Sequence, residues 1–147
     1  MTGWTWVRVG ACLAALAVAL GAWAAHGLDK LLLEKYGTQA YEGVVETIPR
    51  AKKYVADFKT AAEYQMSHAL GIILAGALAI SARRRTNLAA WCFLLGTLLF
   101  SGSLYALTLT GHRKLGMITP IGGVLFIVGW IALAFAGLRT TDGEEPR

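Results

Sequence analysis

The chain has 147 residues, of which 56% are hydrophobic and only 16% are charged, and its formal net charge is +5. A typical soluble domain is about 45–50% apolar and about 25% charged. Because the excess apolar residues collect in long runs with almost no charge, the composition excludes an ordinary soluble enzyme and favours an integral membrane protein. Most basic residues flank these runs, so we interpret them as topology signals and expect no nucleic-acid partner.

Four runs are long enough to cross a bilayer as helices, since a hydrocarbon core of about 30 Å needs roughly 20 helical residues. They cover residues 7–25, 60–82, 88–109 and 118–138. We expect Asn87 to cap the third helix and Thr119 to cap the fourth, with Pro120 in its first turn. The sequence therefore predicts a single all-α membrane domain, a four-helix bundle followed by a polar tail at residues 139–147.

The connection at residues 27–59 has an apolar pattern of its own. Apolar side chains are spaced for one face of a helix in three stretches, residues 28–36, 41–48 and 50–62. The last stripe continues without a helix breaker as far as Gly71. We therefore expect an amphipathic helical segment between the first and second spans that runs directly into the second span.

Basic residues also predict the orientation. The short connection between the second and third spans contains three consecutive arginines, Arg83, Arg84 and Arg85, whereas the connection after the third span has only two basic residues. Short loops rich in Lys and Arg stay in the cytoplasm. We predict that both termini are cytoplasmic, that the 27–59 connection lies outside, and that the protein resides in a bacterial-type inner membrane.

The second span is short of apolar length, because its uninterrupted apolar part at residues 69–82 covers only about 21 Å. To cross the bilayer, this span must take Tyr64, Gln65 and His68 below the headgroups. Intramembrane polar groups are costly, about 2.5–3.5 kcal/mol when charged, so they should face the bundle interior and find partners.

Under this topology the outer ends of all four spans meet at one level, and we predict an intramembrane polar layer there. Its expected members are His26, Tyr64, Gln65, His68, Ser101, Ser103, Tyr105 and Thr119. Such residues commonly join helices by interhelical hydrogen bonds, which is the preferred interpretation, and a ligand, proton or metal site is the alternative. A metal would have to use His26, His68 and His112, which lack the short spacing of common ligand motifs, so we expect no metal and no cofactor.

Small residues within the spans allow helices to approach closely, either inside the chain or against another protein. The positions expected to pack helices are Gly71, Ala75, Gly102, Gly122 and Gly123.

Four segments together carry a family resemblance. They read GAWAAHGL at residues 21–28, FKTAAEYQMSHAL at 58–70, LLFSGSLYALTLTG at 98–111 and ITPIGGVLFIVGW at 118–130. With them the chain resembles the small four-span membrane proteins known as domain of unknown function 423, a family similar to the eukaryotic transmembrane protein 256 group. The resemblance covers almost the whole chain and implies a four-helix membrane protein with no established reaction. The stretch around residues 36–53 is longer than the family pattern, and we interpret it as a docking element.

Three functions fit these observations. Nucleophile elbows, phosphate-binding glycine loops and paired intramembrane carboxylates are missing from the sequence, so we favour a non-catalytic accessory or assembly subunit of a membrane complex. Its partners would be the lipid bilayer and other membrane subunits or a further copy of itself. The alternative is a small homo-oligomeric transporter or proton-conducting protein that uses the polar layer around His26 and His68. A membrane-embedded enzyme ranks last, because no activated nucleophile accompanies these histidines.

Overall fold

Four long helices dominate the structure, a computed structural model that describes residues 1–37, 39–42, 47–82 and 85–136. They are α1 (Gly3–His26), α3 (Arg50–Ser81), α4 (Asn87–Thr110) and α5 (Thr119–Ala136). Each is long and apolar enough to cross a membrane, α5 together with the short helix before it. The predicted all-α membrane bundle is therefore confirmed. The end of the fourth predicted span and the tail at residues 139–147 lie outside the described residues.

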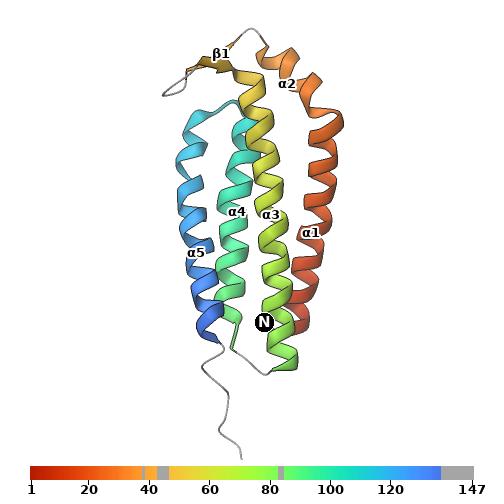
Figure 1. Ribbon diagram of the computed structural model, residues 1–147, viewed down its shortest axis with the longest axis vertical. Coiled ribbons are helices and arrows are strands. Elements are labelled where there is room, and N and C mark those ends of the chain that lie inside the picture. Colours follow the sequence, from red (N-terminus) through yellow and green to blue (C-terminus); the bar gives the residue numbers. More distant parts are fainter. Residues whose placement is uncertain (38, 43–46, 83–84, 137–147) are drawn as a thin grey trace, which may run out of the picture.

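The four helices form an open row rather than a closed ring. Helix α1 packs along α3, α3 packs along α4, and α4 packs along α5 (Figure 1). The N-terminus and the last turn of α5 lie at one end of the row, which we call the N-terminal end. The opposite end, with α2 and the strands, is the loop end. The first and last helices of the row, α1 and α5, thus each pack along one long neighbour.

The second predicted span begins earlier in the structure than the apolar run suggested. Helix α3 starts at Arg50, directly after Pro49, and continues unbroken to Ser81. This confirms that the amphipathic stripe after residue 50 runs into the span. The helix is therefore long enough to cross a bilayer and to extend beyond it at the loop end.

Two predicted helix caps are wrong. Thr86, not Asn87, precedes the first residue of α4, and the Thr86 hydroxyl donates to the carbonyl of Ala75 at 2.7 Å. Asn87 instead accepts a hydrogen bond of 2.8 Å from the indole of Trp6, which joins α4 to the start of α1. Thr119 is already the first residue of α5. Polar contacts between helices have replaced the local capping bonds that a sequence pattern predicts.

Short elements cover the loop end. Helix α2 (Leu28–Tyr36) confirms the first amphipathic stretch, and a 3-10 helix, η1 (Arg113–Met117), leads into α5. The described residues of the second stretch lie in strands and not in a helix: β1 (Ala40–Glu42) and β2 (Thr47–Pro49) pair antiparallel, with Tyr41 opposite Ile48. Tyr41, Thr47 and Ile48 are residue types that favour strands, and this preference overrides the helix-like spacing.

A glycine allows the loop end to close over α4. Gly111 follows the last residue of α4 with a φ of +79°, a left-handed conformation that glycine adopts without strain. A Cβ at this position would lie 2.8 Å from the hydroxyl of Tyr36, so a side chain would also push α2 away. The Tyr36 ring packs edge-on against Tyr54, with centroids 5.0 Å apart, and so ties α2 to α3.

The buried apolar residues form two separate clusters. The loop-end cluster contains Ala24, Leu28, Leu32, Tyr36, Ala51, Tyr54, Phe58 and Leu107. The N-terminal cluster contains Trp6, Ile72, Ala75, Ala89, Ala90, Phe93 and Phe126. On α3, residues 59–71 lie between the two clusters, and this interval contains Tyr64, Gln65 and His68 of the predicted polar layer.

Candidate functional site

Gln65 is the hub of the polar layer. Its side chain is buried on α3, where its amide nitrogen donates to the carbonyl of Leu13 at 2.8 Å. Its amide oxygen accepts from the hydroxyl of Tyr105 at 3.1 Å. One side chain thereby connects α1, α3 and α4 in the interior of the row.

Three hydroxyl groups extend the layer toward α5. The buried Ser101 donates to the carbonyl of Ala61 at 2.8 Å and so joins α4 to α3. The hydroxyls of Ser103 and Thr119 lie 2.8 Å apart and join α4 to α5. Every pair of neighbouring long helices in the row is therefore connected by at least one side-chain hydrogen bond.

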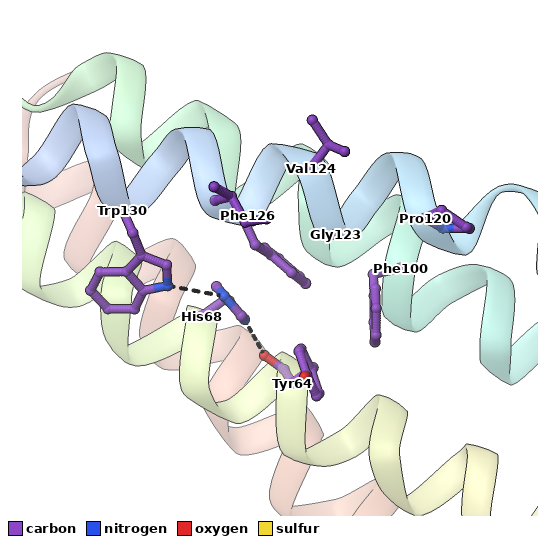
Figure 2. A pocket seen from close by; sticks show the side chains of 9 residues that line it. Tyr64, His68, Phe100, Pro120, Gly123, Val124, Phe126 and Trp130 are labelled. Carbon is purple, nitrogen blue, oxygen red and sulfur yellow. Dashed lines mark hydrogen bonds between the residues drawn. The ribbon is translucent and has the colours of Figure 1, made fainter.

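His68 lies on the side of α3 that faces α5. Its Nδ1 lies 2.8 Å from the carbonyl of Tyr64, and because a carbonyl can only accept, Nδ1 carries the ring proton. The indole N–H of Trp130 donates to Nε2 at 3.3 Å. Both ring nitrogens are thus engaged by the protein, and this arrangement fits the neutral imidazole (Figure 2).

Aromatic rings surround His68 and line a pocket of about 540 Å³ between α3 and α5. The imidazole stacks on Phe126, and the ring of Tyr64 stacks on Phe100 with centroids 4.6 Å apart. The remaining lining residues come from α5: Pro120, Gly123, Val124 and Trp130 are labelled in Figure 2, and Ile127 also lines the pocket. The pocket wall is mostly apolar, and the ring nitrogens of His68 and the indole nitrogen of Trp130 are hydrogen-bonded within the protein.

The layer does not lie at one level, as the prediction assumed: Gln65 and His68 lie near the middle of the row, whereas Ser103 bonds to Thr119, the first residue of α5, closer to the loop end. Leu13, the partner of Gln65, lies near the middle of α1, and Phe126, which stacks on His68, lies near the middle of α5. The prediction counted only the apolar part of the second span, whereas α3 continues as a helix for several turns above Tyr64.

His26 does not join the polar layer. It is the last residue of α1, is exposed, and lies at the level of the loop-end cluster. His112 is exposed after the end of α4. Among the described residues no three His, Cys, Asp or Glu side chains lie close enough to hold a metal ion. The structure therefore does not bring the three histidines together, because each belongs to a different depth or face.

Only part of the predicted small-residue packing occurs. A Cβ on Gly122 would lie 2.5 Å from the backbone nitrogen of Phe100, and one on Gly71 would lie 3.1 Å from the ring of Phe93. Ala75 is fully buried. Gly102 has nothing within 4 Å, and Gly123 has only ordinary contacts at 4.0 Å, so these two positions are not close-packing sites.

Several important positions were missed by sequence reasoning. Gly10 and Gly76 bring the backbones of α1 and α3 together, since a Cβ on either would lie 2.7 Å from a carbonyl oxygen of the other helix. Phe126 and Trp130 surround His68, but their apolar neighbours in sequence make them look like ordinary span residues. Asp57 pairs with Lys53 one helical turn away at the loop end. The i, i+4 spacing of opposite charges was the available signal for that pair.

Two of the predicted topology residues, Arg83 and Arg84, lie outside the described residues. Arg85 is exposed at the N-terminal end, as is Arg8 in the second turn of α1. Apart from the bond between His68 and the carbonyl of Tyr64 in the same helix, the bonds described for the polar layer run between different helices, from side chain to backbone or between side chains. This pattern is typical of helix cohesion in membranes.

Comparison with known proteins places the chain among small bacterial membrane proteins. A family described as protein of unknown function (DUF423) matches residues 20–123. A UPF0382 membrane protein of Staphylococcus epidermidis is 40% identical over 133 residues, which cover 90% of this chain and 94% of the relative. A UPF0382 membrane protein of Bacillus subtilis is 38% identical over 135 residues, covering 90% and 95%. One of Haemophilus influenzae is 39% identical over 128 residues, covering 84% and 85%. No solved structure matches.

Proposed function

The chain belongs to the DUF423 family of bacterial multi-pass membrane proteins, and we propose that it acts as a non-catalytic accessory or assembly subunit of a larger membrane complex. The observation that carries this proposal is the open row of helices. Helices α1 and α5 each pack along one long neighbour, so both present long faces that this chain does not cover.

The outward face of α5 has the composition of a contact surface for lipid or another membrane helix. Large apolar side chains are exposed along its whole length, at Ile121, Val124, Ile127, Val128, Ile131 and Phe135. Lipid alone can cover such a face, but a subunit that docks on other proteins within the membrane also needs an exposed apolar face. Small residues elsewhere show that this chain already uses close helix packing for its own α1–α3 and α4–α5 contacts.

The use of the polar groups supports a non-catalytic role. Gln65, Ser101 and Ser103 each bond to a neighbouring helix, and both ring nitrogens of His68 are engaged. A general acid or base must instead present a polar atom to a substrate. The layer therefore supports a structural role, in which it fixes the helices that carry the contact faces.

We propose the orientation in which the N-terminal end of the row faces the cytoplasm of a bacterial inner membrane. Support comes from Arg8 and Arg85, which both lie at that end, and from the short connection that contains Arg85. Lys and Arg in short connections favour the cytoplasmic side.

Site-specific photocrosslinking in native membranes tests the proposed function. A photoreactive amino acid replaces Ile127 on the outward face of α5, and the matched control places it at the fully buried Phe93. We expect Ile127 to form a discrete adduct with another membrane protein, while Phe93 forms none. A protein that yields no adduct with another membrane protein at Ile127, or at Val18 on the exposed face of α1, would contradict the proposal.

A further inference from the structure

Lys59 and Glu63 form an unused pair of opposite charges on the exposed face of α3. They are one helical turn apart and both side chains are exposed. Among the described residues neither has an ion-pair partner within 4.0 Å, whereas Lys53 and Asp57, one turn closer to the loop end, are paired with each other. The order Lys then Glu is the less favourable one for a pair within one helix. Both charges are therefore available for an intermolecular contact.

The unpaired charge of Glu63 is important because this residue lies beside the membrane-spanning part of α1. Its side chain borders a groove of about 360 Å³ that also involves Ala17 and Gly21 of α1. At 1.5 Å per residue, Gly21 and Ala17 lie about 8 and 14 Å below the end of α1. Because α1 is a candidate membrane span and Ala17 and Gly21 lie well inside it, we place Glu63 within the apolar part of the bilayer. An exposed acid at this depth is costly and requires a partner.

We propose that the partner is a second copy of this chain, which docks on this face so that Lys59 of each copy pairs with Glu63 of the other. Two copies inserted in the same direction are related by a two-fold axis along the membrane normal, and their α3 helices then run parallel. Such an interface is self-complementary: if one residue contacts another across it, the reverse contact also forms. A shift of one turn, about 6 Å, separates residue 59 from residue 63 and is within reach of a lysine side chain. Both copies thus satisfy both charges.

The groove beside Glu63 provides room for the close approach that this pairing needs. Apart from Glu63 it is lined by Ala17, Gly21, Ala62, Met66 and Ser67, which are small residues except for the flexible methionine. A Cβ at Gly21 would meet nothing within 4 Å, so the groove is open at that level. Small residues let helices of two proteins approach closely enough for polar side chains to meet.

The inference rests on the proposed function, because it takes an exposed membrane face as a contact surface and names its occupant. Its test uses the purified full-length chain in lipid bilayers at low protein density, with association measured by energy transfer between labelled copies. We expect the wild type to dimerise. Lys59→Glu places four acids at the interface and Glu63→Lys places four bases there, so each variant alone should associate at least tenfold more weakly. Lys30→Glu, an exposed charge reversal on α2, is the matched control and should leave association unchanged.

A mixture of the two variants tests the proposed charge pairing most directly. A Lys59→Glu copy beside a Glu63→Lys copy again has two opposite-charge pairs, so the mixture should form heterodimers with nearly wild-type affinity. The double variant Lys59→Glu with Glu63→Lys should likewise recover the homodimer. A monomeric wild type, variants that associate as well as the wild type, or a mixture that fails to associate would each overturn the inference. If the bilayer experiment fails but Ile127 captures another protein in native membranes, only the inference is lost. If dimers form but no other protein is captured, only the accessory role is lost.

Discussion

The imidazole of His68 lies face to face with the ring of Phe126, with centroids 3.4 Å apart and ring planes within 9° of parallel. This stack connects α3 to α5, which are not direct neighbours in the row. The hydrogen bonds to the Tyr64 carbonyl and from Trp130 fix the ring in the same position (Figure 2). His68 therefore serves as a bridge across the aromatic pocket, with both nitrogens bound.

Replacing the histidine by phenylalanine separates the stacking from the hydrogen bond. His68→Phe keeps an aromatic ring against Phe126 but leaves the Trp130 N–H without its acceptor. We expect the free energy of unfolding, measured by denaturation in mixed detergent micelles, to fall by about 1 kcal/mol. Adding Trp130→Phe should cost little more, because the shared hydrogen bond is already lost. The exposed His112→Phe is the control and should change stability by less than about 0.5 kcal/mol.

A double-mutant cycle can measure the hydrogen bond between Gln65 and Tyr105. Gln65→Leu removes the bonds to the Leu13 carbonyl and from the Tyr105 hydroxyl, and Tyr105→Phe removes only the latter. We expect the two changes to be less than additive, with a coupling of about 0.6–1.7 kcal/mol in the free energy of unfolding. Strict additivity would mean that the hydrogen bond between these side chains contributes nothing in the membrane.

Substitution by alanine should have opposite effects at two adjacent glycines of α5. A Cβ on Gly122 would lie 2.5 Å from the backbone nitrogen of Phe100, whereas one on Gly123 meets only ordinary contacts at 4.0 Å. Gly122→Ala must therefore force α4 and α5 apart, and we expect a loss of about 1–3 kcal/mol in unfolding free energy. Gly123→Ala should be neutral or should stabilise by up to about 1 kcal/mol, since alanine favours the helix. Equal effects from the two substitutions would contradict the observed packing of α4 on α5.

The spans could be predicted from sequence because apolar length is a local property. Runs of apolar residues gave the existence of all four helices, and the stripe after Arg50 predicted the continuous α3. The caps at Asn87 and Thr119 were wrong because these side chains bond to or lie against other helices, which local patterns do not record. The strands at residues 40–42 and 47–49 were missed because their spacing also fits a helix, and strand pairing decides between the two.

The polar layer was predictable as a set of residues but not as an arrangement. Polar side chains are rare in apolar spans, so Gln65, His68 and Ser101 stand out in the sequence. Their depth depends on how far α3 extends above the bundle, and their partners depend on which helices are neighbours in the row. His26 was included by its position at a span end, although the structure leaves it exposed there. The sequence does not show that Glu63 borders a groove beside Gly21 of the first span, because this neighbour comes from a different helix.

The orientation of the protein in the membrane can be measured with single cysteines. The native Cys12 and Cys92 are replaced by alanine, and one cysteine is introduced at Thr2, at the N-terminal end, or at Gln39, at the loop end; both positions are exposed. The arginines near the N-terminal end favour a cytoplasmic location for that end. We therefore expect an impermeant maleimide to label Gln39→Cys in intact spheroplasts and to label Thr2→Cys only after the membrane is permeabilised. The reverse pattern would mean that the basic residues around the loop end, including Arg113 and Lys114, determine the insertion, and that the exposed charge of Glu63 lies in the cytoplasmic half of the bilayer.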